Sequence, residues 1–204
     1  MSPKRPYVSP LRAEGAARTR ELILSHATAL FAERGYGRVA VADIASAAGV
    51  APKTVFASVG SKSDILYRIV DQGVSASGYR KATDDMLAIR TPEAVLGALA
   101  RGTRVGNASQ FVVHEAIRKA LPVHEDGEAL WERATAAYRD ALRAVARHLH
   151  SLEPSPSCSV GETADLLWYW FGPLGWHALV VENGWTWDRA EKVLHRTAVR
   201  TLLP

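Results

Sequence analysis

The sequence has little of what marks secreted, membrane-bound or disulfide-stabilised proteins. Its 204 residues include a single cysteine, Cys158, so no disulfide can form within the chain and a reducing compartment is expected. No apolar run approaches the roughly 20 residues that span a bilayer. Residues 1–12 carry prolines and arginines in place of an apolar signal core. We therefore expect a cytoplasmic protein with no membrane partner.

Signatures of catalysis are missing as well. The chain has no glycine-rich phosphate loop and no nucleophile elbow, and Cys158 lies in a predicted loop. The histidines and acids at residues 114–115 and 124–126 lack the i, i+4 spacing of a helical zinc site. From these absences we expect no enzymatic activity, no cofactor and no bound metal. An all-α enzyme that acts on an aromatic substrate stays open as an alternative.

Positive charge is concentrated in the N-terminal third of the chain. The whole sequence has a net charge of +4, and residues 1–62 hold nine Lys or Arg against four Asp or Glu, a balance of +5. The remaining residues therefore balance to −1. A basic segment of this kind suits a polyanionic partner such as nucleic acid.

Helical periodicity runs through the chain, and neither strand-like alternation nor an internal repeat competes with it. With 48% hydrophobic residues, a chain of this length can bury a substantial core. Spacing, capping residues and helix-stopping Gly and Pro predict an all-α protein of about nine helices. These are expected near residues 16–34, 41–48, 52–58, 61–80, 92–105, 108–120, 130–149, 161–181 and 187–203.

Residues 41–58 have the small and apolar side chains that a helix-turn-helix requires. Ala45 is small enough for two helices to cross closely, and Gly49 can take the positive φ of the tight turn. Ile44, Val50 and Val55 supply an apolar seam between the two helices. This joint spacing predicts a DNA-binding motif.

The second helix of that motif would face the major groove or its flanking phosphates. Pro52 in its first turn needs no amide donor, and Lys53 and Thr54 lie on the predicted outer side with Ala57 and Ser58. We therefore expect the sequence preference for DNA to depend on this helix.

The same stretch resembles the N-terminal signature of the tetracycline-repressor (TetR) family of transcriptional regulators. The resemblance covers about residues 16–70. The matching residues are Ile44-Ala45, Ala48-Gly49-Val50, Lys53-Thr54-Val55-Phe56 and Ser61-Lys62-Ser63-Asp64-Ile65-Leu66. It implies that Lys62, at the start of a helix, lies beside a DNA phosphate, where the helix dipole adds to the ammonium charge.

Three positions depart from the family pattern. The family usually has Thr at the position of Ala40, Tyr at that of Phe56, and His-Phe at that of Ser58-Val59, so polar groups that face DNA are missing or altered. Lys53, Thr54, Ser58 and the basic tail are expected to compensate. The residues expected to bind DNA are Arg38, Pro52, Lys53, Thr54, Phe56, Ser58 and Lys62.

The resemblance also implies a domain organisation and a function. We expect a basic flexible tail at residues 1–15, a three-helix helix-turn-helix domain at 16–62, and a larger helical domain at 63–204 for effector binding and dimerisation. The expected function is that of a homodimeric repressor which binds palindromic double-stranded operator DNA and releases it when a small molecule binds. A DNA-binding protein without an effector is a further alternative, which a ligand-induced change in operator affinity would distinguish.

The C-terminal half is rich in aromatic residues and holds all six tryptophans. Such residues suit a cavity for an apolar or aromatic effector, although they suit a core or a dimer seam equally well. The residues expected to line the cavity are Phe111, His114, Trp131, Tyr138, Trp168 and Phe171. The small-residue stripe expected at the dimer interface of the last helix is Ala190, Leu194, Thr197, Ala198 and Thr201.

Overall fold

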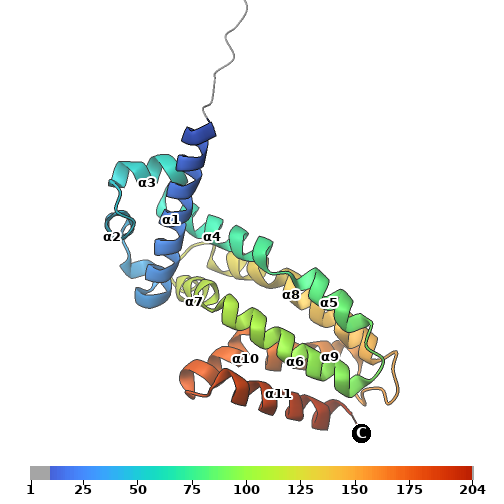
Figure 1. The fold of residues 1–204 in the computed structure, drawn as a ribbon. Coiled ribbons are helices and arrows are strands. Elements are labelled where there is room, and N and C mark those ends of the chain that lie inside the picture. The colour runs from blue at the N-terminus through green and yellow to red at the C-terminus, as the bar shows by residue number, and fades with distance from the viewer. Residues whose placement is uncertain (1–9, 204) are drawn as a thin grey trace, which may run out of the picture. The chain divides into compact units, whose positions relative to one another are not determined.

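The computed structural model describes residues 10–203, and all of their regular secondary structure is helical (Figure 1). This confirms the all-α fold class. The helices of the described residues are α1 (Pro10–Arg34), η1 (Tyr36–Arg38), α2 (Val41–Ala47), α3 (Pro52–Val59), α4 (Lys62–Ala76), α5 (Tyr79–Leu87), α6 (Pro92–Ser109), α7 (Phe111–Ala120), α8 (Gly127–Leu149), α9 (Val160–Phe171), α10 (Pro173–His177), η2 (Ala178–Glu182) and α11 (Trp187–Leu202).

Two compact units share these helices, and neither unit is continuous along the chain. The first contains the described residues up to Gln72 together with Val112–Trp131. The second contains Gly73–Phe111 and the described residues from Glu132 onward. Packing therefore divides the chain within α4, α7 and α8. The functional boundary expected after residue 62 stays a prediction.

The first unit is built on the long helix α1. Its start differs from the expectation, because the helix begins at Pro10 and so takes in residues 10–15 of the predicted flexible tail; residues 1–9 of that tail lie outside the described residues. Ile23, Ala27 and Phe31 are fully buried along one side of α1, which contacts both α2 and α3. Gly35, with φ at 86°, ends the helix where the sequence predicted a stop.

Two predicted helices are divided in the structure. The helix expected over residues 61–80 ends at Ala76, and Gly78 takes the left-handed conformation, with φ at 62°, before α5 begins. The helix expected over 161–181 ends at Phe171, because Pro173 cannot continue the backbone hydrogen bonds. The chain then forms α10 and the π-helical turn η2.

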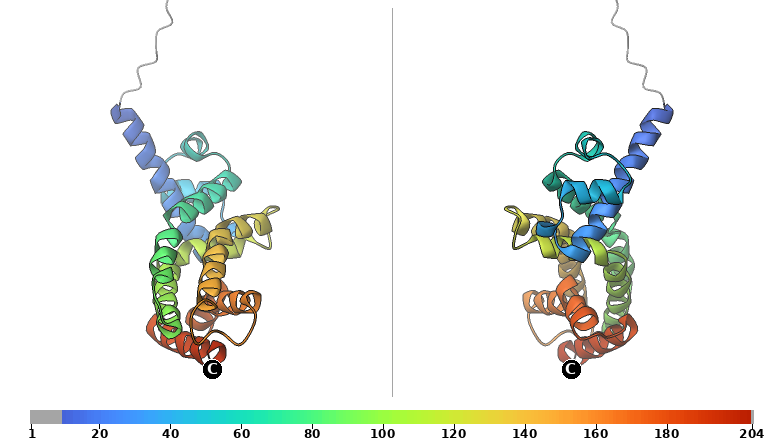
Figure 2. Two further views of the ribbon diagram at one scale, coloured as in Figure 1. Left: turned by 90° about the vertical axis from the view of Figure 1, so that its right-hand side faces the viewer. Right: turned by 90° about the vertical axis from the view of Figure 1, so that its left-hand side faces the viewer.

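In the second unit, α6 contacts α5, α9, α10 and α11, most extensively α11. Figure 2 shows α9, α10 and α11 (orange to red) lying together within this unit. The residues of its core that are at most 1% exposed are Val95, Leu96, Leu99, Ala100, Leu142, Val145, Ala146, Leu149, Leu167, Phe171, Trp176, Ala190, Ala198 and Leu202. Burying a side chain the size of Leu or Val contributes about 1.5–3 kcal/mol, so this cluster dominates the stability of the unit.

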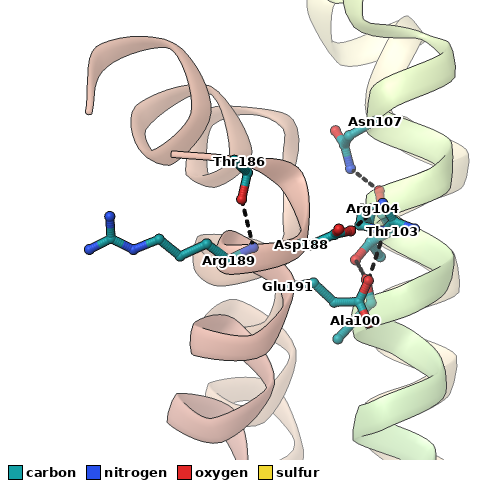
Figure 3. A network of polar contacts seen from close by, with 8 residues as sticks. All are labelled: Ala100, Thr103, Arg104, Asn107, Thr186, Asp188, Arg189 and Glu191. Carbon is teal, nitrogen blue, oxygen red and sulfur yellow. Dashed lines mark hydrogen bonds and ion pairs between the residues drawn. The ribbon is translucent and has the colours of Figure 1, made fainter. Parts of the chain in front are cut away.

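Polar contacts fix α11 against α6 at one end (Figure 3). The Arg104 guanidinium of α6 lies 2.8 Å from the Asp188 carboxylate and 2.7 Å from that of Glu191. Thr186 caps α11, its hydroxyl accepting a hydrogen bond from the backbone N–H of Arg189 at 3.2 Å.

Candidate nucleic-acid interface and ligand cavity

The turn between α2 and α3 has the geometry expected from the sequence. Gly49 has φ at 66°, and the N–H of Val50 donates to the carbonyl oxygen of Ala45 at 3.0 Å, which closes the end of α2. Ile44, Ala45 and Val55 are at most 1% exposed, and Val50 is half-buried. The predicted helix-turn-helix is therefore formed around a buried apolar seam.

The outer side of α3 carries the predicted DNA-contacting residues. Pro52, Lys53 and Phe56 are exposed, whereas Thr54 and Ser58 are half-buried. The ring of Phe56 is 55% exposed, so this apolar side chain is not used by the core of the unit. It can pack on DNA sugar or base edges, but it cannot make the hydroxyl–phosphate contact of the Tyr that the family usually has there.

The start of α2 lacks a capping side chain, because Ala40 has no side-chain hydrogen-bond acceptor. The Asp43 carboxylate partly replaces it, accepting a hydrogen bond from the backbone N–H of Ala40 at 2.7 Å. This is one half of a capping box, the half that the third residue of the helix supplies. The backbone before α2 is therefore held in place without the usual Thr.

The start of α4 has the complete capping box. The backbone N–H of Ser61 donates to the Asp64 carboxylate at 2.7 Å, and the N–H of Asp64 donates to the Ser61 hydroxyl at 3.1 Å. The hydrogen bonds from Ser61 lower the pKa of Asp64. Gly60 precedes the box with φ at 96°, and a Cβ there would lie 2.5 Å from an Asp64 carboxylate oxygen. Only glycine fits this approach to the helix.

Lys62 has a role within the fold that the sequence did not reveal. Its ammonium donates to the backbone carbonyl oxygens of Tyr36 at 3.1 Å and Val39 at 3.0 Å, and lies 4.3 Å from the centre of the Tyr36 ring. These contacts tie the first turn of α4 to η1. An ammonium has three N–H donors, so one is left for a phosphate. The phosphate contact of Lys62 stays a prediction.

Further exposed basic side chains lie before and after the helix-turn-helix in the sequence. Arg38 lies in η1, and the Arg20 side chain of α1 donates from Nε to the carbonyl oxygen of Ser58 at 3.3 Å. This contact places the Arg20 guanidinium at the last turn of α3. Other exposed basic residues of the first unit are Arg12, Arg18, Arg34, Lys53 and Arg68.

A hydrogen-bonded chain connects the loop between α7 and α8 to the start of α4. The Nδ1 atom of His124 accepts from the backbone N–H of Asp126 at 3.1 Å, and its Nε2 lies 3.2 Å from the Ser63 hydroxyl. Because Nδ1 accepts, the neutral ring carries its proton on Nε2 and donates to Ser63. Ser63 in turn lies 3.2 Å from the Tyr36 hydroxyl.

The same loop is held by a second contact. The Tyr67 hydroxyl donates to the Asp126 carboxylate, and this hydrogen bond raises the pKa of Tyr67 to about 12. In the sequence, residues 124–126 stood out only as a weak metal candidate. Within residues 10–203, no group of three or more His, Cys, Asp or Glu residues is placed to hold a metal ion.

The second unit contains an apolar cavity between α5, α6 and α8. The space open to the centre of a water molecule is about 40 Å³. One water needs roughly 10–15 Å³ of such space, so the cavity has room for a short apolar group. Its lining contains no Asp, Glu, Lys, Arg or His. The lining residues are Tyr79, Ala82, Thr83, Met86, Leu99, Gly102, Thr103, Gly106, Asn107, Tyr138, Ala141, Leu142 and Val145.

Of the six residues expected to line a cavity, Tyr138 lines this one. Trp168 does not line the cavity but packs edge-on against Tyr138, with ring centres 5.8 Å apart. The Phe171 ring is fully buried in the core. Phe111 packs edge-on against Trp187 instead.

The other two predicted cavity residues belong to the first unit. These are His114 and Trp131. Burial lowers the pKa of His114 to about 4, so its ring is neutral near pH 7. Helix α5 supplies the cavity residues Tyr79, Thr83 and Met86, which the sequence interpretation missed because it assigned no separate helix there. Their spacing of four and three residues was a usable signal.

The small-residue stripe of α11 does not form a free surface, and the expected interface there is wrong for three of its five residues. Ala190 and Ala198 are 0% exposed and Leu194 is 6% exposed, because they pack into the core of their own unit with α6. Thr197 is half-buried and Thr201 is exposed. Small residues allow α11 to approach α6 closely, and the pattern alone does not tell this packing from that of a dimer.

A helix-turn-helix with an exposed second helix, followed by a larger helical unit, is typical of DNA-binding transcriptional regulators. Residues 23–69 match the model of the family described as bacterial regulatory proteins, tetR family. Residues 23–69 therefore have the sequence pattern of a TetR-family DNA-binding domain.

Solved structures of transcriptional regulators share the fold over nearly the whole chain. PfmR, a TetR-family regulator from Thermus thermophilus, is 21% identical, with a TM-score of 0.69 over 90% of this chain and 95% of that one. A transcriptional regulator from Saccharomonospora viridis in complex with choline is 20% identical, with a TM-score of 0.74 over 92% and 99%. FadR from Bacillus subtilis in complex with stearoyl-CoA is 16% identical, with a TM-score of 0.70 over 89% and 98%. No curated protein sequence matches the chain.

None of the helices in residues 10–203 combines the length and the apolar character needed to cross a membrane.

Proposed function

We propose that this protein is a cytoplasmic repressor which binds palindromic operator DNA as a homodimer and releases it when a small apolar molecule enters the cavity of the second unit. The observation that carries the proposal is the pairing of an exposed recognition helix, α3, with an apolar cavity in a separate helical unit. No enzymatic step is needed for this activity, and the similar solved structures are of transcriptional regulators.

The proposed DNA contacts begin with the exposed side of α3 and the basic residues beside it. Lys53 and Arg38 supply phosphate contacts, whereas the half-buried Thr54 and Ser58 read the base edges with the part of each side chain that stays exposed. Arg20 adds a cation at the end of α3. A helix of eight residues has a small footprint, so two copies, about one helical turn of DNA apart, would supply the specificity of a palindrome.

The proposed dimer surface replaces the α11 stripe with exposed apolar residues between α9 and η2. Tyr169 is 73% exposed, Leu174 52% and Val181 47%, which is unfavourable for large apolar side chains in an isolated protomer. Val160, at the start of α9, is 38% exposed. Covering these side chains with the same surface of a second copy would remove them from water.

The proposed effector is small and apolar because the cavity is small and its lining lacks ionic residues. The structural neighbours in complex with choline and stearoyl-CoA support the use of this fold for binding small molecules. A bound effector acts on DNA affinity only if it prefers one arrangement of the helices over the other.

Operator selection tests the proposal directly. The full-length protein would be used to select duplexes from a random library, and the selected sequences would be measured by a salt-dependent binding assay. We expect a palindromic consensus and weaker binding by Lys53→Ala, while the control Lys81→Ala, an equal loss of charge on an exposed residue of α5, leaves affinity unchanged. Equal affinity for selected and random duplexes would contradict the proposal.

A further inference from the structure

Asn107, a residue that lines the cavity, has a buried hydrogen-bond acceptor that no protein group uses. The residue is 3% exposed and lines the cavity. Its side-chain Nδ2 donates to the carbonyl oxygen of Thr103 at 2.8 Å and to the Tyr138 hydroxyl at 3.1 Å. Its Oδ1 is buried and has no hydrogen-bond partner. Buried polar atoms of this kind are uncommon, because each has lost its water without a replacement.

The neighbouring groups determine the positions of the oxygen and the nitrogen in the Asn107 side-chain amide. Exchanging the oxygen and nitrogen would bring Oδ1 against the Thr103 carbonyl oxygen, and two acceptors repel. Figure 3 shows the amide nitrogen turned toward that carbonyl and the oxygen turned away from it. The Tyr138 hydroxyl donates to the carbonyl oxygen of Phe171 at 2.5 Å, so its own proton is already used. The free position is therefore an acceptor.

The cavity also discriminates by charge. No carboxylate lines it to pair with a cation, and burial raises the pKa of Tyr79 to about 12, so this hydroxyl stays protonated. An open groove beside the cavity shares Tyr79, Thr83 and Ala141 with it and adds Arg80, Asp84 and Asp140. The Asp140 carboxylate of that groove is paired with Arg143 at 2.8 Å, so the groove adds little net charge. The unpaired oxygen of Asn107 itself opposes the approach of an anion.

We propose that the cavity selects an uncharged apolar ligand which carries one hydrogen-bond donor, a hydroxyl or an amide N–H, and that Asn107 Oδ1 accepts from this donor. The inference rests on the proposed function insofar as the ligand acts as an effector. In this cavity, a buried amide that is oriented by Thr103 and Tyr138 recognises the donor, and the apolar walls recognise the rest of the molecule.

A matched set of probes tests the assignment with the full-length protein. Hexan-1-ol and 1-methoxypentane have the same number of non-hydrogen atoms, but only the alcohol donates a hydrogen bond; hexylammonium and hexanoate add a positive or a negative charge. We expect the alcohol to bind about fivefold more tightly than the ether by titration calorimetry, as one extra buried hydrogen bond provides. The two ions should bind more weakly than the alcohol, because the cavity cannot compensate for the loss of their hydration.

Two variants assign the preference to Asn107. Asn107→Leu should bind the alcohol and the ether equally, whereas the control Ser109→Ala, which removes a polar group from an exposed position of the same helix outside the lining, should keep the alcohol preference. If Asn107→Leu does not fold, the ratio of alcohol affinity to ether affinity measured on the unchanged protein still tests the inference. Equal affinities for alcohol and ether, or no binding of either, would overturn the inference, and an alcohol preference that survives in folded Asn107→Leu would do the same.

Operator affinity, measured in the same preparations, separates this inference from the proposed function. An alcohol preference that depends on Asn107, with no change in operator affinity on adding the alcohol, supports the ligand assignment and contradicts the effector role. Normal operator binding in a preparation that binds none of the probes overturns the ligand assignment and leaves the DNA-binding role intact.

Discussion

The helix-turn-helix and the cavity differ in how far apart along the chain their residues lie. The helix-turn-helix and its caps occupy one stretch, from Ala40 to Asp64, and its turn is closed by contacts between near neighbours. The cavity combines Tyr79, Asn107 and Tyr138 from three separate helices. A site made of local contacts is visible in a sequence pattern, whereas a site made of distant residues depends on how the helices pack.

The two regions also differ in how their polar groups are used. At the start of α4, Lys62 and Ser63 make contacts with η1 and with His124, so the polar groups there hold the fold together. In the cavity, Asn107 Oδ1 is buried without a partner. Contacts that hold the start of α4 favour a fixed geometry of the DNA-binding unit, while an unused acceptor favours binding of a ligand.

The largest expected change in stability tests which residues of the second unit belong to its core and which are available for a dimer interface. Leu194→Asp places a carboxylate in the core beside α6, and we expect it to lower the free energy of unfolding by about 4 kcal/mol or more. Tyr169→Asp adds the same charge at an exposed position, so the chain should stay folded but self-associate more weakly. Urea denaturation and sedimentation measure the two effects. A folded, monomeric Leu194→Asp protein would return the dimer interface to the α11 stripe.

The next effect tests the backbone geometry on which the DNA-binding region depends. Gly60→Ala should lower the stability of the first unit by about 3 kcal/mol, because the left-handed backbone and the contact with Asp64 both oppose a side chain. Gly15→Ala is the control: its Cβ would meet nothing within 4 Å, and we expect about 0.5–1 kcal/mol of stabilisation in the interior of α1. Circular dichroism during thermal unfolding distinguishes them, and equal effects would argue against the special geometry of Gly60.

A smaller effect separates the two lysines of the DNA-binding region. Lys62→Ala should lower the free energy of unfolding by about 1–2 kcal/mol, because it removes the hydrogen bonds to the carbonyls of Tyr36 and Val39. Lys53→Ala should change stability by less than about 0.5 kcal/mol and flatten the salt dependence of operator binding by about one unit. Chemical denaturation measures the free energy of unfolding, and salt titrations measure the salt dependence of operator binding. If Lys62→Ala lost only DNA affinity, its role would be the phosphate contact alone.

The smallest expected effect compares a helix that lacks a capping side chain with one that has it. Ala40→Thr supplies a hydroxyl for the N–H of Asp43 and should stabilise the protein by about 0.5–1 kcal/mol. Thr186→Ala removes the cap of α11 and should cost about 1 kcal/mol. Both changes are measured by chemical denaturation, and destabilisation by Ala40→Thr would mean that Asp43 already fills the capping position.

The sequence by itself determined the all-α class, the helix-turn-helix and most helix ends. These depend on contacts within a few residues, such as the positive φ of Gly49, the Ser61–Asp64 capping box and the Thr186 cap. The break at Gly78 was missed, because a glycine inside a helical pattern is compatible with both a continuous helix and a turn.

Only the tertiary structure decided which residues form the cavity and which face of α11 is free. Periodicity predicts that Ala190, Leu194 and Ala198 are buried, but a helix of the same chain and a helix of a second copy bury such a stripe equally well. The hydrogen bonding of Asn107 depends in the same way on groups from other helices. The Tyr138 hydroxyl accepts a hydrogen bond from the Asn107 side-chain nitrogen, and it donates its own proton to the carbonyl oxygen of Phe171. Burial and hydrogen-bond partners are properties of the packed helices, and residues distant in sequence set them.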